Sequence, residues 1–373
     1  MSTFRAAVIG LGRMGSTFDD EVSEGGSVFI PYCHTPSYVA SPRTTLVAGA
    51  DPHDGQRGTY GDRWGISNEH LYADYRQMLE KEKLEIVSVC TTAKIRPQIV
   101  KDCASAGVKA IWAEKPISFS LAEADEMVDA CDSNGVKLAI NCARRWNPFF
   151  MTARQLIDQG ELGEIVQVTA YASCGLSHNG SHLLDTIRYL AGGEGNVKWV
   201  FGEMASDEAA ADDIDLPGNG YLAFEEGVRA YVCGTHTGVL GWEFEVIGTK
   251  GVIRSYNNGK RFEWRAKDES SSSRRSETVI KNFPLPNQPQ GMGLTTVHDI
   301  LDSVENGGEP KCSGRDGRTA LEIAIALRES HRRGGTKIQL PIKDRKLQIL
   351  SAETLHGDEP AIVRRQKAAA KKG

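Results

Sequence analysis

Apolar runs alternate with amphipathic stretches along residues 1–140 of this chain. The runs are rich in Val, Ile, Leu, Ala and Cys and are short enough to be strands. We expect these strands at Arg5–Ile9, Thr45–Ala50, Glu85–Cys90, Lys109–Trp112 and Lys137–Asn141. The stretches between them, such as Pro97–Ala106 and Leu121–Ser133, have the spacing of amphipathic helices. Continuous apolar strands separated by helices predict a parallel sheet covered on both faces, which is a doubly wound α/β domain.

The pattern changes after Pro148, where apolar and polar positions alternate within longer segments. One helix is expected at Phe149–Gln159 and a long one at about Gly317–Arg332. Between them we expect strands at Ile165–Ser173, Tyr221–Phe224, Val228–Cys233, Trp242–Ile247 and Gly251–Ser255. Alternation of this kind predicts a mostly antiparallel sheet with one covered face, in a second, α+β domain.

The length and composition of the chain limit what it can be. At 373 residues it is long enough for two or three domains. We divide it into a doubly wound domain at 1–147, an α+β domain at 148–345 and a C-terminal extension at 346–373, whose end we expect to be disordered. A net charge of −5 gives no reason to expect nucleic acid or an anionic membrane as a partner. No apolar run approaches the roughly 20 residues of a membrane helix.

The eight cysteines have no C-x-x-C spacing, and several lie inside apolar segments. They are typical of small buried hydrophobic residues in a reducing compartment, not of zinc ligands or a disulfide framework. The N-terminal residues enter the first strand at once, which leaves no room for a signal peptide. We therefore expect a cytoplasmic protein.

A glycine-rich loop follows the first apolar run. Gly10, Gly12 and Gly15 have G-x-G-x-x-G spacing, with Arg13 and Met14 between the last two glycines. The first glycine permits a tight turn, the second lets the backbone approach a pyrophosphate, and the third lets a helix pack closely on the strand. The helix N-terminus then offers N–H groups to the phosphates. The loop therefore predicts a dinucleotide site, and the alternative is a glycine-rich turn without a ligand.

Asp51 ends the second predicted strand. A carboxylate there can accept hydrogen bonds from both ribose hydroxyls of NAD and would repel the 2′-phosphate of NADP, so we favour NAD as the cofactor over NADP. Asp51 lies further from the glycines than is usual, which an acidic and glycine-rich insertion at 16–33 explains. The alternative role is an aspartate that caps the next helix.

The ends of the next two predicted strands carry polar residues. Thr91 and Thr92 follow the third strand, and Glu114, Lys115 and Pro116 follow the fourth. Doubly wound sheets bind ligands at the carboxyl ends of their strands, so we expect these residues beside the nicotinamide half of the cofactor. Lys115 would then point into the cleft, on a backbone that Pro116 restricts. An ordinary solvated lysine is the alternative.

A third cluster opens an apolar helix in the second domain. His178, His182 and Asp185 are spaced so that they share one face of a helical segment. Two histidines four residues apart can also chelate a metal, but apart from Asp185 a third ligand is missing, so we expect no metal. Arg145 and Trp146 lie at the end of the first domain and are further candidates for contact with the substrate.

In this order the motifs resemble those of the glucose–fructose oxidoreductase, inositol dehydrogenase and rhizopine-catabolism family. The resemblance covers roughly residues 4–342. It rests on Gly10–Gly15, Glu114-Lys115-Pro116, Asn141–Pro148, Gly180-x-His182-x-x-Asp185 and Glu245–Gly251.

By this resemblance, Lys115 is the catalytic lysine that binds the reacting oxygen and His182 is the proton acceptor. The chain departs from the family pattern at His178, where relatives often carry an aspartate. It also departs at Thr91-Thr92 and Arg96, where relatives commonly have Thr-Pro and a histidine. These departures leave the cofactor prediction intact, and they leave the substrate and the proton relay open.

The resulting hypothesis is an NAD-dependent dehydrogenase or reductase that acts on a secondary alcohol of a sugar, an inositol or a sugar derivative. A lysine ammonium can stabilise a developing alkoxide, and a histidine can take the proton near neutral pH. Two alternatives remain: a glycosidase that uses NAD transiently to oxidise a ring carbon, and a non-catalytic dinucleotide-binding regulator. The resemblance also implies a homodimer or homotetramer that pairs through the second sheet.

Overall fold

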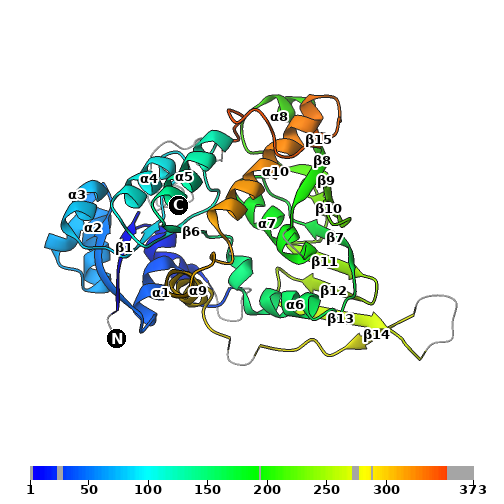
Figure 1. The fold of residues 1–373 in the computed structure, drawn as a ribbon, viewed down its shortest axis with the longest axis horizontal. Helices are drawn as coiled ribbons and strands as arrows, with labels where there is room; N and C mark the ends of the chain where they lie inside the picture. Colours follow the sequence, from blue (N-terminus) through cyan, green and yellow to red (C-terminus); the bar gives the residue numbers. More distant parts are fainter. Residues whose placement is uncertain (1–2, 23–27, 193–194, 271–276, 287–288, 351–373) are drawn as a thin grey trace, which may run out of the picture. The chain divides into compact units, whose positions relative to one another are not determined.

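The computed structural model describes residues 3–22, 28–192, 195–270, 277–286 and 289–350. The predicted disorder at the end of the C-terminal extension concerns residues outside these ranges. The chain forms two compact units (Figure 1). Among the described residues, unit 1 contains the chain up to Ala143 and the returning segment Gln290–Arg318, and unit 2 contains Arg144–Pro289 and the segment from Thr319 to Leu350.

Unit 1 is built on a six-stranded parallel sheet of order β3-β2-β1-β4-β5-β6. Its strands are β1 (Phe4–Ile9), β2 (Thr44–Ala50), β3 (Leu71–Tyr72), β4 (Ile86–Val89), β5 (Ala110–Ala113) and β6 (Lys137–Ile140). The predicted doubly wound domain is therefore confirmed. The direction of strand order reverses between β1 and β4, and ligands of such sheets bind at the carboxyl side of this reversal.

Helices surround this sheet. They are α1 (His34–Ala40), α2 (Asp54–Trp64), α3 (Tyr75–Lys81), α4 (Arg96–Ser105), α5 (Leu121–Ser133) and α9 (Met292–Asn306). Short helical turns lie at Arg13–Thr17, Phe18–Glu21, Asn68–His70 and Ala143–Trp146. α1 and α9 lie side by side (Figure 1), and their buried residues Tyr38, Val297 and Ile300 share one core with Trp112 of β5.

The insertion predicted at 16–33 is partly described. Instead of one helix following the glycines, the chain makes a π-helical turn at Arg13–Thr17 and a 3₁₀ turn at Phe18–Glu21, and α1 begins only at His34. The Asp19 carboxylate accepts hydrogen bonds from the backbone N–H groups of Tyr32 and Cys33, at 2.9 to 3.3 Å. Asp19 therefore ties the 3₁₀ turn to the residues just before α1.

Unit 2 is built on a nine-stranded sheet of order β14-β13-β12-β11-β7-β10-β9-β8-β15. Its strands are β7 (Ile165–Tyr171), β8 (Val197–Met204), β9 (Gly218–Phe224), β10 (Arg229–Cys233), β11 (Glu243–Gly248), β12 (Gly251–Tyr256), β13 (Arg261–Lys267), β14 (Thr278–Lys281) and β15 (Ile338–Gln339). Every neighbouring pair is antiparallel except β7 and β10, so the prediction of a mostly antiparallel sheet is confirmed. The helices of this part are α6 (Pro148–Asp158), α7 (Gly180–Ala191), α8 (Asp207–Ala211) and α10 (Gly314–Arg332).

One face of this sheet is covered by a close helix contact. A Cβ atom on Gly202 of β8 would lie 2.2 Å from the Leu327 carbonyl oxygen, and one on Gly220 of β9 would lie 2.4 Å from the Leu327 side chain. These two glycines are paired in the sheet, so α10 packs directly on the strands there. Neighbouring positions point the other way, and they carry Phe201 and Tyr221.

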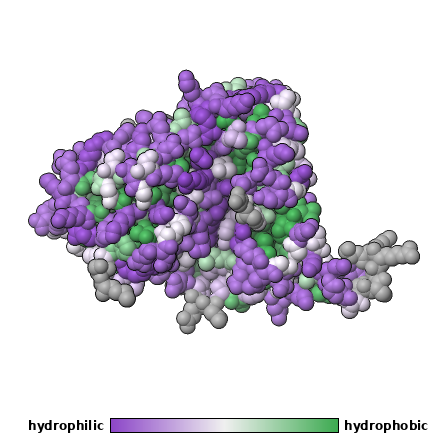
Figure 2. All heavy atoms as spheres, viewed as in Figure 1, coloured by the Kyte–Doolittle hydropathy of each residue, from purple (hydrophilic) through white to green (hydrophobic). Residues whose placement is uncertain are grey.

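In the part of the chain that the structure describes, no helix combines the length and the apolar character needed to cross a bilayer. Figure 2 shows a mostly hydrophilic surface on the visible side, with hydrophobic residues in small patches.

Candidate active site

The glycine loop joins β1 to the π-helical turn. Gly10 has a φ of +88°, and a Cβ atom there would lie 2.7 Å from the Cys90 carbonyl oxygen. A Cβ atom on Gly15 would lie 2.1 Å from the Gly10 carbonyl oxygen. Both glycines are thus required by the fold itself. A Cβ atom on Gly12, in contrast, would meet no atom within 4 Å, so the open space beside Gly12 can admit a pyrophosphate.

Arg13 and Met14 sit in the turn after these glycines. The Arg13 guanidinium bonds both carboxylate oxygens of Glu21 at 3.0 Å and lies 4.2 Å from the centre of the Phe18 ring. Met14 packs against the small cluster around Tyr32. The insertion thus occupies the Arg13 side chain, which leaves the loop backbone to face a phosphate.

Asp51 lies at the end of β2 and is 9% exposed. Its Oδ2 accepts a hydrogen bond from the Leu11 N–H at 3.1 Å, and its Oδ1 accepts one from the His53 N–H at 3.0 Å. The His53 Nδ1 lies 3.0 Å from the same Oδ1. Helix α2 is preceded directly by His53, so Asp51 is not its N-cap residue. Instead, Asp51 ties the glycine loop to the start of α2, and its carboxylate retains lone pairs for ribose hydroxyls.

Thr91 and Thr92 follow β4, next to the reversal of strand order. The Thr91 Oγ1 is buried and makes no hydrogen bond within the described chain. Such an atom is costly unless a partner from outside the chain completes it. The Thr91 carbonyl is held by the buried Arg96, which also donates to the Pro116 carbonyl. Arg96, which departs from the family pattern, therefore links the loops after β4 and β5.

Glu114 precedes Lys115 at the end of β5, and both its carboxylate oxygens are in use. Oε1 accepts from Asn141 Nδ2 at 2.6 Å and lies 3.2 Å from His34 Nε2, and Oε2 accepts from the Lys115 N–H at 3.2 Å. Burial raises the pKa of Glu114, but the His34 hydrogen bond, the Lys115 charge and the Asn141 amide outweigh it and bring the pKa to about 2. Glu114 is thus a buried anion that fixes the Lys115 backbone.

The sequence did not suggest His34 as a member of this network. The ring is fully buried and stacks on Trp112 with centroids 3.6 Å apart. Burial lowers its pKa, so the ring is neutral at pH 7. Its Nδ1 lies 2.8 Å from Ser88 Oγ, which in turn lies 2.7 Å from the Tyr38 hydroxyl. A neutral ring that donates from Nε2 to Glu114 and accepts at Nδ1 satisfies every contact.

Lys115 itself is half-buried, and its peptide bond to Pro116 is cis. It lies in unit 1, whereas His182 lies in unit 2. Their convergence on one substrate stays a prediction.

The histidine cluster of unit 2 surrounds the start of α7. His182 is in the first turn of α7 and half-buried, but His178 lies in the turn before the helix, so the two do not share one helical face as their spacing suggested. Among the described residues, neither histidine belongs to a group of three or more His, Cys, Asp or Glu side chains close enough to share a metal ion.

The other predicted substrate contacts are mostly buried side chains: Asp185, Arg145 and Trp146. Asp185 is fully buried, and its oxygens accept charge-assisted hydrogen bonds from Nε and Nη2 of Arg145 at 2.8 to 3.1 Å. Trp146 is also fully buried. A contact of Asp185, Arg145 or Trp146 with substrate stays a prediction, and the hydrogen bonds between Arg145 and Asp185 tie the segment after β6 to α7.

A further carboxylate, Asp215, was not found from the sequence. It lies in the segment before β9 and accepts hydrogen bonds from the N–H groups of Ser177 and His178, at 2.8 and 2.6 Å. Its position 37 and 38 residues from its partners leaves no local pattern that could have revealed it.

Comparisons with known proteins match the whole of this architecture. Residues 4–142 match the model of an oxidoreductase family with an NAD-binding Rossmann fold, and residues 171–340 match the C-terminal alpha/beta domain of the same oxidoreductase family. The chain is 26% identical over 358 residues to scyllo-inositol 2-dehydrogenase (NAD(+)) of Bacillus subtilis, covering 91% of this chain and 97% of the relative. It is 27% identical over 315 residues to D-apiose dehydrogenase of Paraburkholderia graminis, covering 78% and 82%.

Among solved structures, the fold is similar to an inositol dehydrogenase homologue of Azotobacter vinelandii in complex with NADH and myo-inositol. The TM-score is 0.70 at 18% identity, and the alignment covers 91% of this chain and 98% of the other. At this identity the likeness concerns the fold alone.

Proposed function

We propose that this chain, which belongs to the Gfo/Idh/MocA oxidoreductase family, oxidises a secondary alcohol of a sugar, an inositol or a sugar derivative with NAD, and that Lys115 and His182 are its catalytic pair. The family makes the chain an NAD(P)-dependent oxidoreductase that acts on CH–OH groups. The choice of NAD, the class of substrate and the two catalytic residues are the parts that we add.

The observation that carries the proposal is the combination of free space and a missing partner at the carboxyl edge of the unit 1 sheet. Gly12 leaves room for a pyrophosphate, and Thr91 Oγ1 is a buried atom that still needs a partner. Asp51 lies at the neighbouring strand end and can accept ribose hydroxyls. These three residues would hold the dinucleotide, and the nicotinamide, when bound, supplies the hydride acceptor.

In this proposal the Lys115 ammonium group lies beside the substrate oxygen. Its backbone is anchored to the buried Glu114 anion, and Pro116 is held by Arg96, so the lysine extends from a rigid base. An ammonium group beside the oxygen stabilises negative charge that develops as the alcohol loses its proton. His182 in unit 2 takes that proton at its ring nitrogen.

A kinetic comparison tests the pair. The purified protein is first checked by absorbance for retained cofactor, and NAD reduction is then screened over inositols, sugars and sugar acids. With the best substrate, Lys115→Met and His182→Ala should each lower kcat by about 10²- to 10⁴-fold while NAD binding persists. Matched controls are Lys109→Met, before the start of β5, and His236→Ala on the surface, which should keep near wild-type rates.

Each outcome of this test points to one answer. Wild-type turnover in either Lys115→Met or His182→Ala would remove that residue from the mechanism. Release of a leaving group from a glycoside without net NADH would identify the glycosidase alternative. Cofactor binding without turnover of any substrate in the panel would favour the regulator.

The cofactor preference rests on Asp51 and Arg13. Asp51 presents a negative charge to the 2′ position, and Arg13 is engaged by Glu21, so this loop offers no counter-charge for a 2′-phosphate. We therefore expect the double variant Asp51→Ser/His53→Arg to shift the ratio of kcat/KM values from NAD toward NADP. An unchanged ratio would exclude Asp51 from ribose recognition.

The proposal of an oligomer is supported by exposed aromatic residues on the unit 2 sheet. Phe201, Tyr221 and Tyr231 lie in one row across β8, β9 and β10, and Trp199 packs on this row with ring centres 5.3 to 5.4 Å from Phe201 and Tyr221. Phe201 and Tyr231 are each 39% exposed, which is a large apolar exposure for adjacent side chains. We expect a homodimer or homotetramer, and light scattering that shows a monomer would contradict this.

The compartment remains part of the proposal. None of the eight cysteines, all of which the structure describes, is in a disulfide, which supports the cytoplasm predicted from the sequence.

A further inference from the structure

The turn that carries His178 into α7 is held by a carboxylate from another part of unit 2. The two Asp215 oxygens accept hydrogen bonds from the backbone N–H groups of Ser177 and His178, at 2.8 and 2.6 Å, and Asp215 is 8% exposed. The fit is tight, because a Cβ atom on Gly175 would lie 2.7 Å from the carboxylate. A buried carboxylate that accepts two N–H groups is a strong and directional anchor.

This turn and the first turn of α7 are joined by further hydrogen bonds. Ser181 donates its N–H to the Ser177 carbonyl at 2.9 Å, and its hydroxyl donates to the same carbonyl. The His182 N–H donates to the Asn179 carbonyl at 3.0 Å. The backbone of His182 therefore follows the position of the turn, and the turn follows Asp215.

Asp215 is itself fixed by the C-terminal part of the described chain. The Asp215 N–H donates to the Leu350 carbonyl at 2.7 Å, and the Leu350 N–H donates to the Asp213 carbonyl at 2.7 Å. Ile214 and Leu350 form a parallel bridge between these bonds. The segment thus behaves as a short two-stranded ribbon.

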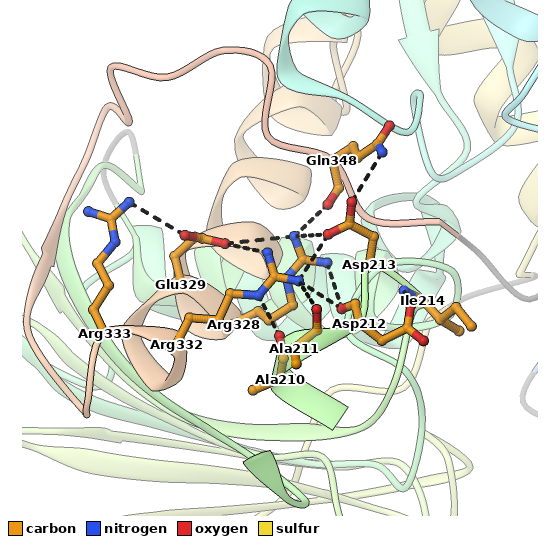
Figure 3. Close-up of polar contacts among 10 residues, drawn as sticks. All are labelled: Ala210, Ala211, Asp212, Asp213, Ile214, Arg328, Glu329, Arg332, Arg333 and Gln348. Carbon is orange, nitrogen blue, oxygen red and sulfur yellow. Dashed lines mark hydrogen bonds and ion pairs between the residues drawn. The ribbon is translucent and has the colours of Figure 1, made fainter. Parts of the chain in front are cut away.

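Two arginines of α10, Arg328 and Arg332, bind this ribbon, and we call them the arginine clamp (Figure 3). Arg332 donates to the carbonyls of Ala210, Ala211 and Asp212 and to the Asp213 carboxylate. Arg328 is fully buried and donates to the carbonyls of Asp212 and Gln348. The clamp therefore grips both strands of the ribbon.

Two carboxylates, Glu329 and Asp213, lie beside the two arginines of the clamp. Glu329 accepts from Arg332 Nη1 at 2.9 Å and lies 3.8 Å from Arg328, while Asp213 lies 2.9 Å from Arg332 and 3.4 Å from Arg328. Burial raises the pKa of Asp213, but the Arg332 and Gln348 hydrogen bonds and the arginine charges lower it overall. Asp213 therefore stays ionised at neutral pH, and both clamp arginines face the two anions Glu329 and Asp213, while Arg333 adds a third cation at 3.4 Å from Glu329.

We infer that Asp215, held by the arginine clamp, is a positioning residue that sets the location of His182 and His178 for the reaction. This inference rests on the proposed role of His182 as the proton acceptor. Within the turn, Asp215 accepts hydrogen bonds from the backbone N–H groups of Ser177 and His178, so it would act on the reaction through the position of the histidines.

The test is a double-mutant cycle. Asp215→Asn keeps the shape of the side chain but turns an NH₂ group toward one of the two backbone donors. With His182 intact, kcat should fall by about 10- to 100-fold, since a misplacement near 1 Å costs up to about that factor, while NAD affinity stays within about twofold because the glycine loop lies in unit 1. In the His182→Ala background, Asp215→Asn should change the residual kcat by less than about twofold.

A second variant keeps the inference testable if Asp215→Asn does not fold. Arg332→Lys retains the charge but cannot reach all its partners, and it should lower kcat by a smaller factor, about threefold, again only when His182 is present. Asp207→Asn is the matched control, because the Asp207 carboxylate is 96% exposed and pairs with His331 of α10, which is not part of the clamp.

The outcomes separate the inference from the proposed function. If His182→Ala keeps wild-type turnover, the proposed function fails. If His182→Ala loses turnover but Asp215→Asn and Arg332→Lys do not, the inference alone fails. Equal losses in the wild-type and His182→Ala backgrounds would show a general structural effect and would also overturn the inference.

Discussion

Replacing Glu114 by glutamine removes the buried anion at the end of β5 while keeping the size of the side chain. The carboxylate accepts hydrogen bonds from His34, Asn141 and the Lys115 N–H, and Glu114 is 6% exposed. Glutamine can accept hydrogen bonds through its one oxygen, but its NH₂ group would face a donor from which the second carboxylate oxygen of Glu114 now accepts. We therefore expect a less stable unit 1.

The magnitude follows from the pKa of Glu114, which is lowered from 4.5 to about 2. One pKa unit corresponds to about 1.4 kcal/mol, so the folded state stabilises the ionised form by about 3 kcal/mol. The ring of His34 is neutral at pH 7, so it contributes a hydrogen bond and not a full charge, and about 3 kcal/mol is the upper limit. We expect Glu114→Gln to lower the free energy of unfolding by about 2 to 3 kcal/mol at pH 7.

The same reasoning fixes the pH dependence. Because the folded pKa of Glu114 is depressed, its contribution is complete above the unfolded value of 4.5 and is lost as the pH falls toward about 2. At pH 4 about three-quarters of such carboxyls are protonated in the unfolded chain. The difference between wild type and Glu114→Gln should therefore shrink by about 1 kcal/mol between pH 7 and pH 4.

Urea unfolding measures this difference, with tryptophan fluorescence as the signal, because Trp112 stacks on His34 within the same network. Glu126→Gln is the control, since Glu126 is 57% exposed and pairs only with Lys101 on the surface. The reasoning is refuted if Glu114→Gln is as stable as wild type at pH 7, or if its deficit is the same at pH 7 and pH 4.

Four further variants test other parts of unit 1. Gly12→Ala should leave the melting temperature unchanged but weaken NAD binding by at least about tenfold, because its Cβ atom would meet only the cofactor. Gly15→Ala should lower the melting temperature, because its Cβ atom would meet the protein itself. The same change in NAD binding and in melting temperature for both variants would contradict this. Arg96→Lys cannot hold both the Thr91 and Pro116 carbonyls and should cost about 1 to 3 kcal/mol in urea unfolding, while the exposed Arg76→Lys should cost little. Asp19→Ala frees the N–H groups that close the insertion and should increase hydrogen exchange there, and unchanged protection would refute the anchoring role.

The elements of the site that the sequence predicted are those with a local signature. The spacing of Gly10, Gly12 and Gly15 after an apolar run was sufficient to predict a dinucleotide loop, because the turn, the close approach and the helix packing are all decided within six residues. Lys115 was found by a topological rule, since parallel strands deliver their carboxyl ends to one edge. The position of His178 was misjudged, because periodicity cannot tell a turn before a helix from its first turn.

The sequence by itself therefore determined the doubly wound domain, the mostly antiparallel second sheet and the class of cofactor, since hydrophobic period and glycine spacing are properties of neighbouring residues. Tertiary structure alone decided which side chains support them: His34 reaches Glu114 across 80 residues, Asp215 reaches His178 across 37, and Gln290–Arg318 returns to complete unit 1. Buried polar groups in folded proteins are almost always hydrogen-bonded. Their partners are the residues that the tertiary fold brings close, and these can be far away in the sequence. No local pattern encodes that choice.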